Sequence, residues 1–86
     1  MLHKLKIQKA FADAKINGDK MFEIRNNYNK GFQKGDFVQY NAVDECNLYV
    51  PHEINKRIYE ITYVTNYEQK EHYVVYGERE CKNTTK

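Results

Sequence analysis

The sequence predicts a small α+β domain in which one or two short helices accompany a curled, mainly antiparallel sheet of about five strands. Two observations predict this fold class. A chain of 86 residues, 41% hydrophobic and 30% charged, has enough apolar side chains for one core and too few for a second. Apolar residues also recur with the period of a strand in most segments and with the period of a helix in only one. We therefore take residues 1–80 as one domain and residues 81–86 as a flexible tail.

The first element is a strand followed directly by a helix. Residues His3–Ile7 alternate between apolar and charged side chains, which is typical of a strand. The period then lengthens, which predicts a helix over about Gln8–Ile16. Its apolar stripe is formed by Ile7, Ala10, Phe11 and Ala14. Gly18 ends the helix, because glycine readily adopts the left-handed conformation found at helix C-termini.

The second strand is predicted over Met21–Asn26. Its alternation places Phe22 and Ile24 on one face of the strand. Glu23 and Arg25 share the other face, because side chains two residues apart on a strand point the same way. We expect the face with the two charged side chains to be exposed.

The remaining strands are predicted over Phe37–Val43, Arg57–Asn66 and His72–Arg79. Among them, Arg57–Asn66 has the clearest alternation. The stretch Asp44–Asn55 contains the single proline and is predicted to be a variable connection, with a short extended piece near Leu48–Val50.

Charge is distributed unevenly along the chain. The net charge is only +2, from 14 Lys and Arg against 12 Asp and Glu. Residues 1–34 hold eight cations and three anions, whereas residues 35–86 hold six cations and nine anions. An excess of positive charge in one region is a weak indication of a nucleic-acid or phosphate surface, and accidental clustering on a solvated surface would look the same.

Several classes of protein are excluded by what the sequence lacks. No apolar run approaches the roughly 18 residues of a membrane span, and the start of the chain has no signal-peptide hydrophobic region. We therefore expect a cytoplasmic protein with no membrane partner. Four residues could be imagined as metal ligands: Cys46, His52, His72 and Cys81. Their spacing matches no common zinc pattern, so we expect two free thiols, no metal and no cofactor.

One segment combines residues that suit a binding cleft. Gly18, Lys20, Glu23 and Arg25 form the pattern Gly-x-Lys-x-x-Glu-x-Arg where the helix ends and the second strand begins. Lys20 is a mobile point cation and Arg25 a planar fork of donors, and both suit phosphate or base-edge acceptors. Glu23 can accept from an exocyclic amine or hold Arg25. The alternative is that Glu23 and Arg25 form a surface ion pair worth about 0–1 kcal/mol, with no ligand.

This pattern resembles the signature of ASCH domains, which are relatives of the PUA RNA-binding fold. Other segments extend the resemblance to the small DUF3850 branch of that superfamily: His3–Ile7, Phe22–Arg25, Gly31–Asp36, Ile61–Val64 and Gly77. The resemblance implies a PUA-like pseudo-barrel with a cleft beside the glycine-lysine turn. It also implies that Lys20, Glu23 and Arg25 bind RNA or a nucleotide. Whether the ligand is a polymer or a mononucleotide stays open, as does the oligomeric state.

Aromatic residues are numerous, with eight Tyr, four Phe and no Trp. A base stacked on an exposed aromatic ring contributes about 1–3 kcal/mol to single-strand binding. Tyr28, in the Asn-rich loop after the motif, is the best placed to stack, although packing on the protein would explain it equally well. Tyr67 comes next. We expect Phe22, Tyr63 and Tyr73 in the core or in cross-strand pairs.

Two other functions remain as alternatives. Some ASCH proteins are amidohydrolases acting on acylated nucleosides, with a lysine at the motif position and a threonine where this chain has Glu23. The corresponding catalytic residues would be Lys20, Glu23 and, as a distal carboxylate, Glu60. A glutamate beside Lys20 would keep that lysine charged, so we expect a binding protein rather than an enzyme. The third possibility is a protein-protein interaction module that uses Arg57–Asn66 as an edge strand.

Overall fold

One mixed five-stranded sheet carries most of the regular structure. The computed structural model describes residues 1–81, so the predicted tail lies outside the described residues apart from Cys81. The elements are β1 (Leu2–Gln8), α1 (Lys9–Ile16), β2 (Phe22–Asn26), β3 (Phe37–Val43), the 3-10 helix η1 (Glu53–Lys56), β4 (Tyr59–Thr65) and β5 (Tyr73–Glu80). The five strands and the helix lie where the hydrophobic period predicts them. The predicted fold class allows a second short helix but does not place it; η1 begins in the stretch Asp44–Asn55 expected to be a connection and ends one residue beyond it.

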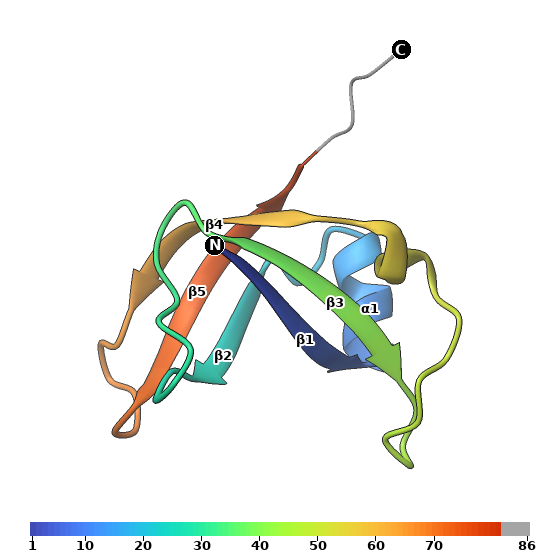
Figure 1. The fold of residues 1–86 in the computed structure, drawn as a ribbon, viewed down its shortest axis with the longest axis horizontal. Helices are drawn as coiled ribbons and strands as arrows, with labels where there is room; N and C mark the ends of the chain where they lie inside the picture. The colour runs from blue at the N-terminus through green and yellow to red at the C-terminus, as the bar shows by residue number, and fades with distance from the viewer. Residues whose placement is uncertain (82–86) are drawn as a thin grey trace.

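The strand order is β1-β3-β4-β5-β2, and among the strands of residues 1–81 only the neighbours β1 and β3 run parallel. The sheet curls into a half-barrel, with α1 lying behind β3 in the view of Figure 1. This arrangement confirms the predicted mainly antiparallel, barrel-like α+β fold. The two edges of the sheet are β1 and β2. The strand expected as a possible edge, Arg57–Asn66, instead lies in the middle of the strand order as β4, which pairs with β5 along Tyr59–Thr65 and with β3 through Tyr59 and Glu60.

An irregularity in β4 helps the sheet to curl. The pairing of β4 with β5 shifts register between Ile61 and Tyr63, which leaves Thr62 as an extra residue. A bulge of this kind bends a strand and increases its twist. Gly77 lies opposite Tyr63, and a Cβ atom built on Gly77 would be 3.4 Å from the Thr62 hydroxyl oxygen.

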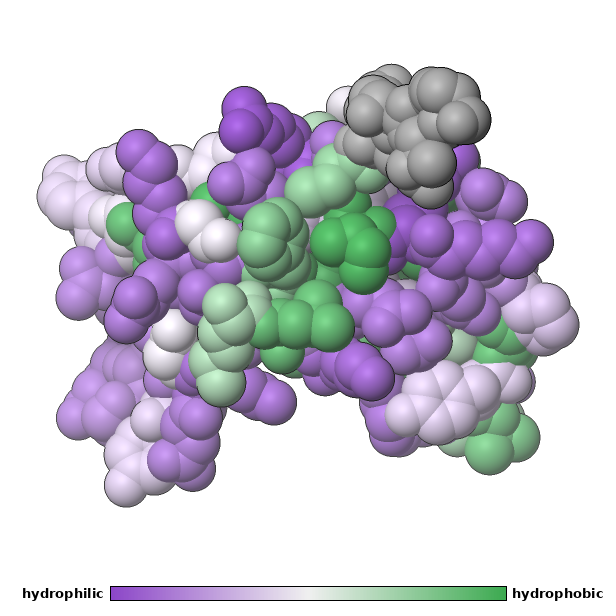
Figure 2. Space-filling view, turned by 45° about the horizontal axis from the view of Figure 1, so that its top comes forward, coloured by the Kyte–Doolittle hydropathy of each residue, from purple (hydrophilic) through white to green (hydrophobic). Residues whose placement is uncertain are grey.

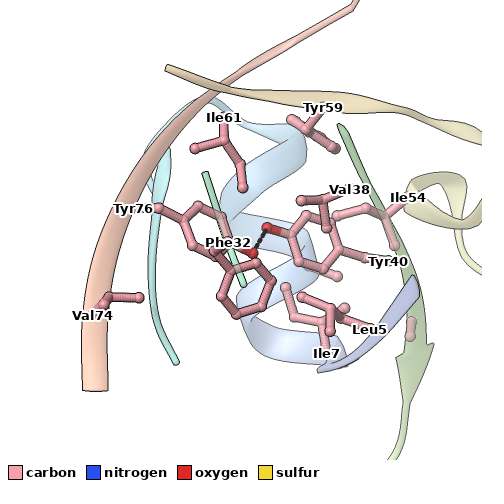
Figure 3. Packing of buried hydrophobic residues seen from close by; sticks show 12 residues of the cluster. Leu5, Ile7, Phe32, Val38, Tyr40, Ile54, Tyr59, Ile61, Val74 and Tyr76 are labelled. Atoms are coloured by element: carbon pink, nitrogen blue, oxygen red, sulfur yellow. Dashed lines mark hydrogen bonds between the residues drawn. The ribbon is translucent and has the colours of Figure 1, made fainter. Parts of the chain in front are cut away.

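The core lies inside the curl of the sheet (Figure 3). Its residues are Leu5, Ile7, Ala12, Phe32, Val38, Tyr40, Ala42, Ile54, Tyr59, Ile61, Val74 and Tyr76. Phe32 reaches it from the loop between β2 and β3, and its ring centroid lies 5.1 Å from that of Tyr76. The hydroxyl groups of Tyr40 and Tyr76 meet at 2.8 Å in the interior. The core is therefore partly polar, with tyrosine hydroxyl groups at its centre.

The helix ends as its sequence predicts. Gly18 has a φ of +81°, and its N–H donates to the carbonyl of Lys15. The N–H of Asp19 donates to the carbonyl of Ala14, which completes a Schellman motif. This turn leads the chain directly into the residues of the motif.

The buried face of α1 differs from the predicted apolar stripe. Phe11 is half exposed and Ala10 is exposed, whereas Ala12 and Lys15 are buried. The prediction was wrong because the helix packs through a face that carries a lysine, and buried acidic partners hold that lysine. No helix in residues 1–81 is long and apolar enough to cross a membrane.

Apolar side chains also reach the surface. Figure 2 shows them gathered near the middle of a face that is otherwise mainly hydrophilic. Leu2 and Phe37, which are register partners in β1 and β3, are 46% and 40% exposed. The starts of these two strands therefore present apolar side chains to solvent.

Candidate functional site

The second strand, β2, turns its charged side chains inward. Glu23 is only 6% exposed, whereas Phe22 and Ile24 on the opposite face are 44% and 54% exposed. Glu23 and Arg25 do share one face, as the alternation predicts. The expectation that this face is exposed was wrong, because Glu23 meets cations inside the fold that the hydrophobic pattern does not reveal.

Glu23 joins the charged residues of the motif. Its Oε2 lies 2.8 Å from Lys20 Nζ and 3.0 Å from Lys15 Nζ, and its Oε1 accepts from Arg25 Nε at 3.1 Å. Arg25 also donates from Nη2 to the carbonyl of Lys6 at 2.9 Å. Arg25 therefore links β2 to β1, the two edges of the sheet. The structure brings Lys20, Glu23 and Arg25 together, but as a largely buried cluster rather than a surface ion pair.

Lys15 is the residue that the sequence reasoning missed. Its side chain is fully buried, and its Nζ lies 2.5 Å from Glu78 Oε2 and 3.1 Å from the carbonyl of Phe22. The other carboxylate oxygen of Glu78 accepts from the Tyr40 hydroxyl at 2.5 Å. We call Lys15, Glu23, Glu78, Tyr40 and Tyr76 the ionic network. The alternation of β5 could have indicated that Glu78 is buried. Val74, Tyr76 and Glu78 occupy every second position of the strand, and all three point inward.

The two carboxylates of the ionic network are shifted in opposite directions. Burial alone raises the pKa of Glu23. The pKa is nevertheless held below its usual value by the charge of Lys15, by hydrogen bonds from Lys20 and Lys15, and by the charge of Arg25. Burial raises the pKa of Glu78 above its usual value in spite of Lys15 and Tyr40. Burial also raises the pKa values of the Tyr40 and Tyr76 hydroxyls, which stay protonated and act as donors. Glu23 is therefore the firmly charged carboxylate of the pair.

A pocket of about 290 Å³ opens between β1 and β2, and we call it the motif pocket. Its lining comes from both edge strands, α1, the end of β3 and the loop after β3: Lys6, Ile7, Gln8, Phe11, Glu23, Ile24, Arg25, Val43 and Asn47. Two of the predicted ligand-binding residues, Glu23 and Arg25, line it. The apolar members provide walls on which a flat ring can pack, and the charged pair provides hydrogen-bonding groups.

Lys20 stands beside the motif pocket rather than in its lining. Its Nζ donates to the carbonyl of Phe22 at 3.0 Å as well as to Glu23. The same Nζ lies 5.1 Å from the centroid of the Phe11 ring and 4.7 Å from that of Phe22. The cation is thus held between two half-exposed rings, one of which lines the motif pocket.

The predicted distal carboxylate and the main stacking candidate both lie outside this cluster. Glu60 pairs with Arg79 at 2.9 Å, and the register of β4 and β5 places these two residues opposite each other. Tyr28 is 68% exposed and lines a different pocket, of about 420 Å³, beyond the end of β2. Tyr67 is 75% exposed and lines neither pocket. The residues that share the motif pocket are therefore fewer than the sequence suggests.

Three aromatic residues were expected to be packed. Tyr73 is partly buried, but Phe22 is half exposed and Tyr63 is 64% exposed. Phe22 and Tyr63 both lie in register with Gly77, which stands between them on the outer face of the sheet. Gly77 offers no side chain against which either ring could be buried, so the prediction was wrong for these two.

The excess of positive charge in the first part of the chain divides into two groups. Four cations form ion pairs: Lys9, Lys15, Lys20 and Arg25. Another four have no ion-pair partner within residues 1–81: Lys4, Lys6, Lys30 and Lys34. The positive charge that is not used in ion pairs therefore lies on β1 and on the loop between β2 and β3, which precede and follow β2 in the chain.

Comparison with known proteins identifies the family of the chain but no function. The search of curated proteins found no match. The model of the family described as "Domain of unknown function (DUF3850)" matches residues 2–77, which is most of the chain. With this match across β1 to β5, the chain belongs to the DUF3850 family.

Proposed function

We propose that this protein is a small ASCH-type, PUA-like domain that binds RNA or a nucleotide at the motif pocket. The observation that carries the proposal is the lining of that pocket, where Glu23 and Arg25 lie together among apolar side chains at the gap between two edge strands. A nucleobase has apolar faces and a polar edge, which matches this combination. The half-barrel fold is consistent with a PUA-like architecture.

The charged pair keeps hydrogen-bonding capacity for a ligand. Arg25 uses Nε for Glu23 and Nη2 for the carbonyl of Lys6, which leaves the Nη1 donors. Oε1 of Glu23 accepts one hydrogen bond, from Arg25, and a carboxylate oxygen can accept two. A base edge that presents both an acceptor and an amine would satisfy these groups. The same cations that hold Glu23 also fix its orientation before a ligand arrives.

Phosphate groups have a separate partner at the rim. Lys6 lines the motif pocket, and its Nζ lies 5.5 Å from the centroid of the Tyr49 ring without an acidic partner in residues 1–81. Lys4 lies two residues earlier on the same exposed side of β1. These lysines supply the unpaired positive charge that binding to a phosphate backbone needs.

The charge states in the cluster favour binding over hydrolysis. A lysine acts as a general base only when it is neutral, and Lys20 Nζ lies 2.8 Å from a carboxylate whose pKa is lowered. A carboxylate with a lowered pKa is also a poor proton donor near neutral pH. The pair therefore suits ligand recognition better than proton transfer.

The test is RNA binding by the Lys20→Ala, Arg25→Ala double variant. We expect it to fold, because Lys15 still holds Glu23 at 3.0 Å. Fluorescence anisotropy with a labelled RNA hexamer, at about 50 and 200 mM salt, should show weaker binding and a shallower dependence on salt. The matched control is Lys56→Ala, Arg79→Ala, which removes the same charge away from the motif pocket and should keep most of the affinity.

Two results would contradict the proposal. One is equal affinity and an equal salt slope for the wild type and the Lys20, Arg25 variant. The other is release of free cytidine from N-acylated cytidine by the wild-type protein, which would favour the amidohydrolase function instead.

A further inference from the structure

We propose that the pocket at the end of β2 is a second base-binding subsite, so that the ligand is a segment of single-stranded RNA rather than a mononucleotide. This inference rests on the proposed function of the motif pocket and deepens it. We call the second site the loop pocket. Its volume is about 420 Å³, and it is lined by Asn27, Tyr28, Asn66, Gln69, Lys70, Glu71, His72, Tyr73 and Val74.

Hydrogen-bonded turns hold the walls of the loop pocket in place. The N–H of Asn27 donates to the carbonyl of His72 at 2.6 Å, and the N–H of Tyr73 donates to the carbonyl of Lys70 at 2.9 Å. His72 has a φ of +70°, a conformation that is uncommon for residues other than glycine. Such a conformation persists when the surrounding structure enforces it. The loop is thus shaped by contacts that do not depend on a ligand.

The aromatic ring at this site is exposed yet oriented. The Tyr28 ring meets the His72 ring edge to face, with centroids 5.0 Å apart and planes at 73°. The N–H of Tyr28 donates to the side-chain oxygen of Asn26 at 2.9 Å, which fixes the backbone that carries the ring. A ring held in this way while 68% of the residue is exposed offers a stacking surface at little entropic cost.

The polar groups of the loop pocket suit a base better than a cluster of phosphates. Asn66 and Gln69 carry amides that combine a donor and an acceptor, which can match the edge of a neutral base. The charged side chains are of both signs, since Lys70 and Glu71 both line the pocket. Lys70 can contact a single phosphate, whereas the negative charge of Glu71 would repel several phosphates gathered at this site. A stacked base with one neighbouring phosphate fits this set.

The two pockets border the same row of side chains. Glu23, Arg25 and Asn27 lie two residues apart and share the more buried face of β2 and its extension. Arg25 lines the motif pocket and Asn27 lines the loop pocket. Two residues of a strand span about 7 Å, which equals about two steps of a stacked nucleic-acid strand at about 3.4 Å per step. Two nucleotides of one strand that are separated by a single nucleotide can therefore reach both sites.

The experiment compares a mononucleotide with a short polymer. Wild-type protein and Tyr28→Ala are titrated with 5′-mononucleotides by calorimetry and with a labelled mixed-sequence RNA hexamer by anisotropy. The matched control is Tyr63→Ala, which removes a similarly exposed ring from the outer face of β4. Tyr28→Phe keeps the ring and should keep the affinity. All variants are checked for an unchanged thermal midpoint.

We expect the wild type to bind the hexamer more tightly than any mononucleotide. Tyr28→Ala should bind the hexamer about ten-fold more weakly, in line with the loss of one stacked base, and should bind mononucleotides as the wild type does. Equal binding of the hexamer by the wild type and Tyr28→Ala, or equal affinity of the wild type for both ligands, overturns this inference and leaves the proposed function intact. Failure of the wild type to bind either ligand overturns both.

Discussion

The two ends of β2 differ in how they use polar residues. At its start, the ionic network places a lysine and two carboxylates in the interior, where Lys15 pairs with both Glu23 and Glu78. At its end, the loop pocket presents uncharged amides and an exposed ring, with its charged groups at the surface. The first region depends on complete pairing, because an unpaired charge in the interior is costly. The second tolerates substitution, since solvent can replace any contact that is lost.

This difference changes how the motif is understood. The pattern from Gly18 to Arg25 looks like a ligand site when read as sequence alone. In the structure, the motif residue Glu23 also holds Lys15, which attaches the helix to the turn, to β2 and to Glu78 on β5. A motif residue can therefore be important for the fold, for the ligand or for both, and stability and binding measurements on variants separate these roles.

The largest expected effect is that of Lys15→Met. The change removes the cation from between two buried carboxylates and abolishes its contacts with two backbone carbonyls. We expect it to lower the free energy of unfolding by about 3–5 kcal/mol, as for other buried ion pairs that lose one partner. Urea denaturation measures this, with Lys9→Met on the exposed side of the same helix as the control.

A second variant keeps this prediction testable if Lys15→Met does not fold. Adding Glu78→Leu removes the carboxylate that would be stranded, and the double variant should recover much of the lost stability. A loss below about 1 kcal/mol for Lys15→Met, the range of surface ion pairs, would contradict the structural role assigned to Lys15.

A smaller loss is expected for Tyr40→Phe. The Tyr40 hydroxyl donates to Glu78 and lies 2.8 Å from the Tyr76 hydroxyl, so its removal takes one donor from a buried carboxylate. We expect a loss of about 1.5–3 kcal/mol in the free energy of unfolding. The control is Tyr59→Phe, because Tyr59 is equally buried and its hydroxyl has no hydrogen-bond partner within residues 1–81. That control should be neutral or slightly stabilising, and equal losses for the two variants would show that the ionic network does not need the hydroxyl.

The smallest effect is a change in the dependence of stability on pH. The pKa of Glu23 is lowered in the folded protein from an ordinary value of 4.5, so its ionisation stabilises the fold above that pH. This contribution is lost as the pH falls below about 4.5 and through the folded pKa. Glu78, whose pKa is raised, acts in the opposite sense, because its ionisation opposes folding as the pH rises above its ordinary value.

The pH prediction is checked by urea unfolding of the wild type and Glu23→Gln from about pH 7 to about pH 3. The wild type should lose stability more steeply below about pH 4.5 than the variant does. Glu45→Gln, which removes an exposed carboxylate outside the ionic network, provides the comparison. Parallel curves for the wild type and Glu23→Gln would mean that Glu23 is not the firmly charged member of the pair.

The strands and the helix could be predicted from the sequence because their boundaries follow local signals. Alternation and turn residues locate β3 over Phe37–Val43, and Gly18 ends α1 where a left-handed residue is required. It was harder to predict which face of each element points inward, because the apolar face is usually taken as the buried one. Lys15 and Glu23 point inward because each has a partner from another part of the chain, and a hydrophobic pattern assigns both to the surface.

The candidate site was predictable only in its local part. Lys20, Glu23 and Arg25 meet because they lie within six residues of one another at a turn and along one strand. Glu78 enters through the pairing of β2 with β5, which sequence alone does not specify. Residue type suggests Glu60 for the same cleft, and proximity in sequence suggests Tyr28, but the sheet register and the loop geometry place both elsewhere.

The position of β2 in the sheet has a consequence for the order of folding. β2 is made early in synthesis, but within residues 1–81 its one neighbour in the sheet is β5, the last strand of this part of the chain. Glu78, the buried partner of Lys15, lies on that same strand, 63 residues farther along the chain. A nascent chain therefore carries the motif strand without a sheet partner until β5 has left the ribosome. A chain that stops before Tyr73 would retain every motif residue and still lack the strand that assembles them.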